Sequence, residues 1–113
     1  MHELQITQSV LDIVLRKSQE AQASKVTRIN LVIGELAGFA PNCIEFYFDS
    51  LSKDTIAEGA VLDFQSIPVQ LRCRVCSTTF DPRDTEWVCP GCHSQSIEIV
   101  GGKELYINSM EVE

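Results

Sequence analysis

Two Cys-x-x-Cys pairs constrain this chain more than any other feature. Two residues separate Cys73 from Cys76, two separate Cys89 from Cys92, and twelve lie between the pairs. Each pair can form a tight turn that points both sulfur atoms at one point, and two such turns complete a tetrahedron. Thiolates in this geometry select zinc, with an iron–sulfur site as the chemical alternative. The pattern predicts a structural zinc site made by these four cysteines.

The predicted zinc module spans residues 70–98. So short a segment buries little apolar core, and we expect the metal to replace that core. Four protein ligands leave no coordination position open for water, so the site should stabilise a fold rather than catalyse hydrolysis. A pair of redox-active dithiols is the other reading of the cysteines, but no thioredoxin-like βαβ pattern precedes either pair.

The composition describes a globular chain with an acidic surface. The 113 residues are 44% hydrophobic and 22% charged, and the formal net charge is −7. Four thiolates with one divalent ion would make that charge more negative still. Such a chain repels nucleic acid and anionic membranes, and it suits a cationic cargo or a basic partner. We therefore expect no nucleic-acid partner and no membrane partner.

Location is predicted from the hydropathy pattern. No apolar run approaches the roughly 20 residues that span a bilayer. The start, Met1-His2-Glu3, lacks the basic and apolar segments of a secretory signal. We expect a cytoplasmic protein, in which five cysteines are not explained by disulfides.

Apolar periodicity predicts the elements around the zinc module. Val10, Leu11 and Val14 recur at helical spacing, whereas Ile29 and Leu31 alternate with polar residues as in a strand. The pattern predicts helices at 4–22 and 41–53, and strands at 26–33, 60–69 and 104–112. The predicted fold class is α+β: two helices packed on a small three-stranded sheet, with an inserted zinc-ribbon module. The predicted domains are 1–69 plus 99–113, and 70–98.

Two side chains near these elements have open roles. His93 directly follows the last cysteine of the motif. It is interpreted as a surface histidine or one that supports a ligand, with exchange for a cysteine or pH sensing as the sharper alternative. Cys43, the fifth cysteine, is expected to be a partly buried, small apolar residue on the second helix.

The amino terminus is a second candidate metal site. The amine of Met1, the amide nitrogen of His2 and its imidazole can form fused chelate rings, and Glu3 can add an amide or carboxylate donor. Nitrogen-rich planar donation suits Ni(II) or Cu(II). From residue types alone an idle, exposed histidine is the alternative.

Five segments taken together resemble the HypA/HybF family of nickel metallochaperones over essentially the whole chain. Their order and the total length carry the resemblance more than any one motif does. The segments are Met1-His2-Glu3-Leu4; Arg-Ile-Asn-Leu-Val-Ile-Gly-Glu at 28–35; Phe-Tyr-Phe-Asp at 46–49; the four cysteines with Cys-Pro-Gly-Cys-His at 89–93; and Ser-Met-Glu-Val-Glu at 109–113.

The resemblance implies a nickel-binding domain joined to a zinc-ribbon domain, and a carrier rather than an enzyme. It implies nickel ligands Met1, His2 and Glu3, Ni(II) as cargo and a structural Zn(II). It also implies delivery to the large subunit of [NiFe] hydrogenase with a HypB-type GTPase, and in some relatives supply to urease. A homodimer is left open.

The chain departs from the family at one place. Some relatives carry an acid in the loop before the second helix, where this sequence has Gly38-Phe39-Ala40-Pro41-Asn42. The resemblance therefore does not carry over to this loop a fourth side-chain ligand or an acid that supports the nickel site. Outside the family, the alternative function is a zinc-ribbon adaptor that binds a protein or RNA without metal cargo. A metal-dependent hydrolase would need an open zinc position, which four cysteines do not leave.

Overall fold

The computed structural model describes residues 2–84 and 86–113, with His2 and Asp84 described by their backbone alone. The chain forms two compact units. The first consists of residues 1–32, 39–65 and 106–113, and the second of residues 33–38 and 66–105. Each unit is therefore assembled from segments that are far apart in the sequence, and each is described separately below.

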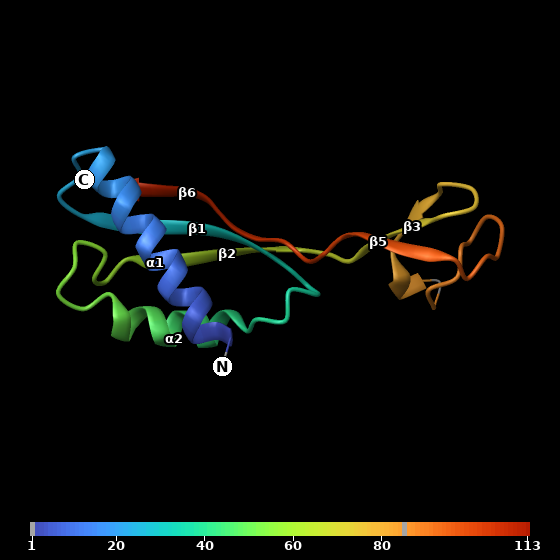
Figure 1. Cartoon of the computed structure of the whole chain (residues 1–113), viewed down its shortest axis with the longest axis horizontal. Helices are drawn as coiled ribbons and strands as arrows, with labels where there is room; N and C mark the ends of the chain where they lie inside the picture. The colour runs from blue at the N-terminus through green and yellow to red at the C-terminus, as the bar shows by residue number, and fades with distance from the viewer. Residues whose placement is uncertain (1, 85) are drawn as a thin grey trace. The chain divides into compact units, whose positions relative to one another are not determined.

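The first unit contains two helices and a three-stranded sheet (Figure 1). The sheet has the strand order β2-β1-β6. Figure 1 shows α1 crossing the strands with α2 beside it. The elements are α1 (His2–Glu20), β1 (Val26–Gly34), α2 (Pro41–Leu51), β2 (Val61–Ile67) and β6 (Leu105–Val112).

The core of the first unit lies where α1, α2 and β1 meet. Val14 of α1, Ile29 and Leu31 of β1, and Phe48 of α2 are at most 1% exposed. Helical spacing on α1 and strand alternation on β1 place these side chains on facing surfaces. Burial of this apolar area is the main source of stability for the unit.

α1 ends through its own backbone hydrogen bonds. The amide of Ala23 donates to the carbonyl of Ser18 (2.9 Å), and the amide of Gln22 donates to that of Gln19 (3.0 Å). Gln22 has φ +56°, so this is a Schellman ending with a non-glycine residue at the left-handed position. The helix begins and ends two residues earlier than the predicted range of 4–22.

The second unit contains the cysteines and a smaller sheet with the order β4-β3-β5. Both outer strands pair antiparallel with β3, and Arg72 lies opposite Glu98 in the register. The guanidinium of Arg72 is 2.8 Å from the carboxylate of Glu98. The elements are β3 (Gln70–Cys73), β4 (Thr79–Phe80), the 3-10 helix η1 (Pro82–Asp84) and β5 (Ile97–Gly101).

Segment 33–38 joins the second unit through backbone hydrogen bonds. The amide of Leu36 donates to the carbonyl of Gly102 (2.6 Å), and the amide of Gly34 donates to that of Glu104 (2.7 Å). The amide of Glu35 donates to the carbonyl of Ile67 (2.9 Å). An added Cβ at Gly34 would overlap the carbonyl of Gly102, so this close approach requires glycine.

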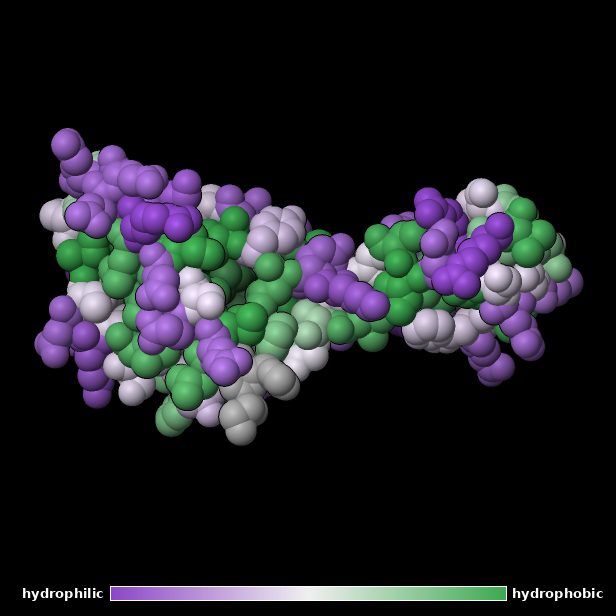
Figure 2. Space-filling model, viewed as in Figure 1, coloured by the Kyte–Doolittle hydropathy of each residue, from purple (hydrophilic) through white to green (hydrophobic). Residues whose placement is uncertain are grey.

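The α+β class expected from the sequence is confirmed, with two helices and two small three-stranded sheets. The assignment of nickel binding to residues 1–69 plus 99–113 and of zinc to 70–98 stays a prediction. Hydrophobic residues remain on the surface of both units (Figure 2), and Phe46 and Val75 are each 69% exposed. In the described part of the chain, neither α1 nor α2 has an apolar stretch that could span a bilayer.

Candidate metal centre

The two cysteine pairs form two turns with the same backbone hydrogen bonds. In the first turn, the amide of Ser77 donates to the carbonyl of Cys73 (2.9 Å), and the amide of Cys73 donates to the carbonyl of Thr78 (2.9 Å). The fifth residue of this turn, Ser77, has φ +64°. The turn thus closes on itself and fixes the direction of both cysteine side chains.

The second turn repeats this pattern. The amide of His93 donates to the carbonyl of Cys89 (2.9 Å), and the amide of Cys89 donates to the carbonyl of Ser94 (3.0 Å). His93 has φ +63° and is thus the structural counterpart of Ser77. Two similar turns facing each other are the arrangement that the paired spacing predicted.

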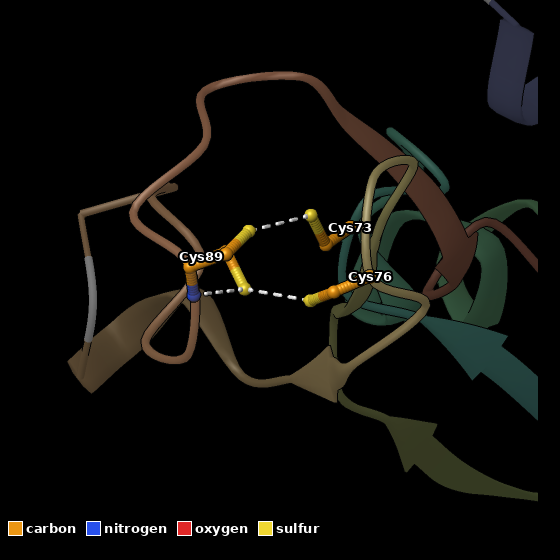
Figure 3. A group of neighbouring side chains, drawn as sticks. Cys73, Cys76 and Cys89 are labelled. Carbon is orange, nitrogen blue, oxygen red and sulfur yellow. Dashed lines mark hydrogen bonds between the residues drawn. The ribbon is translucent and has the colours of Figure 1, made fainter.

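The four sulfur atoms face one another across the gap between the turns (Figure 3). The Sγ atoms of Cys73 and Cys92 are 3.5 Å apart, as are those of Cys76 and Cys89. All four lie within 4.8 Å of one another. A tetrahedral site with metal–sulfur bonds of about 2.3 Å has sulfur–sulfur edges of about 3.8 Å. The donor set and its spacing therefore fit a tetrahedral thiolate-bound metal.

Burial differs within the cluster. Cys73 and Cys89 are 1% and 0% exposed, whereas Cys76 and Cys92 are exposed. Each turn therefore contributes one inner and one outer sulfur. The inner sulfurs accept backbone amides: the amide of Val75 lies 3.4 Å from Sγ of Cys73, and that of Cys92 lies 3.5 Å from Sγ of Cys89. Amide donors of this kind stabilise thiolates.

The surroundings of the thiols shift their pKa values in different directions. The Thr78 hydroxyl, 3.1 Å from Sγ of Cys76, lowers the pKa of Cys76 to about 6 with help from the Thr78 amide. The amide of Cys76 lowers the pKa of Cys73. The amide of Ser94 acts in the same direction on Cys92, but the sulfur of Cys73 and burial outweigh it and raise the pKa of Cys92 to about 12.

His93 is exposed, as the first of its two interpretations expected. Among the described residues, the only group of three or more His, Cys, Asp or Glu ligand atoms is that of the four cysteines. This arrangement does not support a role for His93 as a metal ligand in place of a cysteine. His93 has a positive φ, so its backbone takes the left-handed conformation that closes this turn.

The predicted nickel ligands lie at the start of α1. Met1 and the side chain of His2 lie outside the described part of the chain, so the structure does not test them. Glu3 is described: its Oε2 lies 3.4 Å from the backbone nitrogen of Ala40. Its own amide and that of Ala40 lower the pKa of Glu3. Both amides therefore favour the carboxylate over the neutral acid.

The loop before α2 offers a backbone donor to Glu3. Ala40 precedes α2, and Asn42 is exposed on its first turn. The prediction that Cys43 is partly buried is wrong, since Cys43 is exposed. Ile44 and Phe48 define the buried face of α2, and Cys43 points about a third of a turn away from them.

Two contacts were not predicted from the sequence: the Thr78 hydroxyl on Cys76 and the Ala40 amide on Glu3. The sequence does mark the position of the first contact, because Thr78 and Ser94 are hydroxyl residues at the same position after their cysteine pairs. It does not mark the second, because a backbone amide contact between residues 37 positions apart leaves no trace in residue types.

The fold and the cluster define a class: a small α+β protein with a four-cysteine metal site of the zinc-ribbon type. A family model described as hydrogenase/urease nickel incorporation, metallochaperone, hypA, matches residues 1–112. The chain belongs to this HypA family of nickel metallochaperones.

Relatives and solved structures agree with the family match. A hydrogenase maturation factor HypA from Dehalococcoides mccartyi is 47% identical, with 100% of this chain and 95% of that protein covered. One from Caldanaerobacter subterraneus is 40% identical, with both chains fully covered. A solution structure of a HypA protein has a TM-score of 0.80 at 28% identity, covering 100% of this chain and 97% of that one. The Helicobacter pylori nickel metallochaperone HypA has a TM-score of 0.71 at 27% identity, covering 97% and 96%.

Proposed function

We propose that this chain is a nickel carrier rather than an enzyme. It binds Ni(II) as cargo through Met1, His2 and Glu3, and releases it for maturation of [NiFe] hydrogenase. The family match over residues 1–112 is the observation that carries the proposal. The start of α1 at His2 supports it, because the first amides of a helix lack carbonyl partners within the helix.

The chemistry of the site follows from these donors. The Met1 amine, the His2 amide nitrogen and the His2 imidazole supply a nitrogen-rich set that suits Ni(II). Glu3 adds its amide nitrogen or its carboxylate. The helix dipole disfavours a cation here by about 0.3–1 kcal/mol, a small cost beside the bonds to ionised donors. Protons compete for the same donors, so binding weakens as pH falls.

The second metal in this proposal is Zn(II), bound by Cys73, Cys76, Cys89 and Cys92. The sulfur spacing and the four-thiol donor set support it. Zinc here has a structural role, since four protein ligands exclude substrate from the metal.

A role in hydrogenase maturation implies hydrogenase-related partners. We propose a HypB-type GTPase and the hydrogenase large subunit, in the cytoplasm, with no nucleic acid and no membrane among the partners. The net charge of −7 supports the last point, because phosphate backbones and anionic lipids repel it. A homodimer remains compatible with this proposal.

Calorimetry on the untagged, zinc-loaded protein tests the nickel proposal. We expect one Ni(II) per chain, and loss of that binding in His2→Ala with zinc content unchanged. A residue added before Met1 should also abolish binding, because it removes the amine from its position beside His2. Undiminished nickel binding in His2→Ala would contradict the proposed ligand set.

A further inference from the structure

The start of α2 lacks a cap from its own sequence. Ala40 is the N-cap residue, with φ −86° and ψ 121°, and no side chain of this segment caps the helix. An alanine has no oxygen to offer the first amides, and Pro41 has no N–H. The Cys43 amide donates to the Ala40 carbonyl at 3.0 Å, so the Ala40 amide is left to water or to a group from another element.

Glu3 meets that need from the neighbouring helix. Its Oε2 accepts the amide of Ala40 at 3.4 Å, and Figure 1 shows the starts of α1 and α2 side by side. A carboxylate near a helix N-terminus also interacts favourably with the helix dipole. The contact thus connects the first turn of α1 to the first residue before α2.

The backbone of Glu3 is held as well. Thr7, one turn further along α1, is 0% exposed, and its hydroxyl donates to the Glu3 carbonyl. This bond runs back along the same helix and links the Glu3 carbonyl to a buried side chain of α1. Glu3 is therefore anchored at its carbonyl and at its carboxylate.

We infer that Glu3 is a positioning residue, whose carboxylate fastens the start of α1 to the N-cap of α2 and holds the peptide at Glu3 in place. The inference rests on the proposed function, because that peptide carries the proposed nickel donors. It gives the carboxylate a contact with the Ala40 amide rather than a bond to nickel. Ordering this segment before nickel arrives reduces the entropy cost of binding.

Hydrogen exchange in zinc-loaded, nickel-free protein tests the contact itself. In Glu3→Ala the Ala40 amide should exchange about fivefold faster, the size expected for loss of a helix cap. Glu3→Gln keeps an acceptor oxygen at the same place and should leave exchange near the wild-type rate. Glu20→Ala removes an exposed carboxylate at the far end of α1 and serves as the matched control. Equal exchange in Glu3→Ala and wild type would overturn the inference.

Nickel titration separates positioning from ligation. We expect Glu3→Ala to weaken nickel binding about fivefold and Glu3→Gln to restore it. Ala40→Pro removes the amide donor at a φ close to the proline range, and should weaken binding to the same extent as Glu3→Ala. Ala40→Gly keeps the donor and is its control. Weak binding in Glu3→Gln with normal binding in Ala40→Pro would make the carboxylate a ligand and overturn the inference.

The two proposals fail separately. If the wild-type chain binds no nickel at its amino terminus, the proposed function fails, and the exchange of the Ala40 amide still decides whether Glu3 caps α2. If nickel binds but the Ala40 amide exchanges at the same rate in Glu3→Ala and wild type, the positioning role fails and the nickel proposal stands.

Discussion

Thr78 and Ser94 occupy equivalent positions, two residues after the second cysteine of their turns, yet their hydroxyls do different things. The Thr78 hydroxyl lies 3.1 Å from Sγ of Cys76, whereas that of Ser94 accepts the amide of Ser96 at 3.0 Å. One hydroxyl therefore stabilises a thiolate, and the other stabilises only the local turn. This pair lets the effect of a sulfur hydrogen bond be measured against a matched background.

Thr78→Val should weaken zinc binding about tenfold, the usual cost of losing a group that hydrogen-bonds a metal ligand. The Thr78 hydroxyl is the largest of the contacts that lower the pKa of Cys76 from 9.0 to about 6, so the stabilisation is complete above about pH 9 and is lost as pH falls to about 6. Without the hydroxyl, zinc should be released at a higher pH on acidification. Competition with a chromophoric chelator over a pH series measures both effects.

Ser94→Ala is the control for Thr78→Val and should keep the wild-type affinity and release pH, because no sulfur contact is lost. Equal weakening in the two variants would mean that turn stability, not the sulfur contact, governs zinc binding.

At the scale of elements, local residue patterns predicted helices and strands, but the sequence did not predict which distant segments pair. The positions of both helices and of β1, β2 and β6 follow from apolar spacing and from Pro41, and the grouping of the four cysteines follows from their own spacing. The short strands β3, β4 and β5 were not predicted. Segment 33–38 is different: it joins residues 66–105 through hydrogen bonds between backbone groups. Backbone pairing of distant segments involves no particular side chains, so only Gly34 and Gly102 mark it in the sequence.

Gly34→Ala tests this junction and should destabilise the protein by about 3 kcal/mol. The added methyl overlaps the carbonyl of Gly102, and neither backbone can move without breaking the hydrogen bond from Leu36. Gly38→Ala is the comparison: its φ is +81°, but nothing lies within 4 Å of the added carbon. It should cost about 1 kcal/mol for the left-handed backbone alone. Chemical denaturation of the zinc-loaded variants gives both values, and equal costs would show that Gly34 is not sterically required.

At the scale of the whole molecule, the two units are stabilised by different means. The hydrophobic core cluster lies entirely in the first unit, among residues of α1, β1, α2 and the segment before β2. Among the described residues of the second unit, the side chains less than 2% exposed are Leu71, Cys73 and Cys89. Two of these three are proposed metal ligands, so little apolar burial remains to hold this unit when the metal is absent.

Metal removal should therefore unfold one unit and spare the other. With a zinc chelator, or in Cys76→Ala, amides of β3 and β5 should lose protection from hydrogen exchange while those of β1 keep it. Hydrogen exchange read residue by residue measures this, and Cys43→Ala, which removes an exposed thiol outside the cluster, should change neither region. Loss of protection in β1 on chelation would mean that the core of the first unit depends on the metal. Retained protection in β3 would mean that Leu71 and the strand pairing suffice without it.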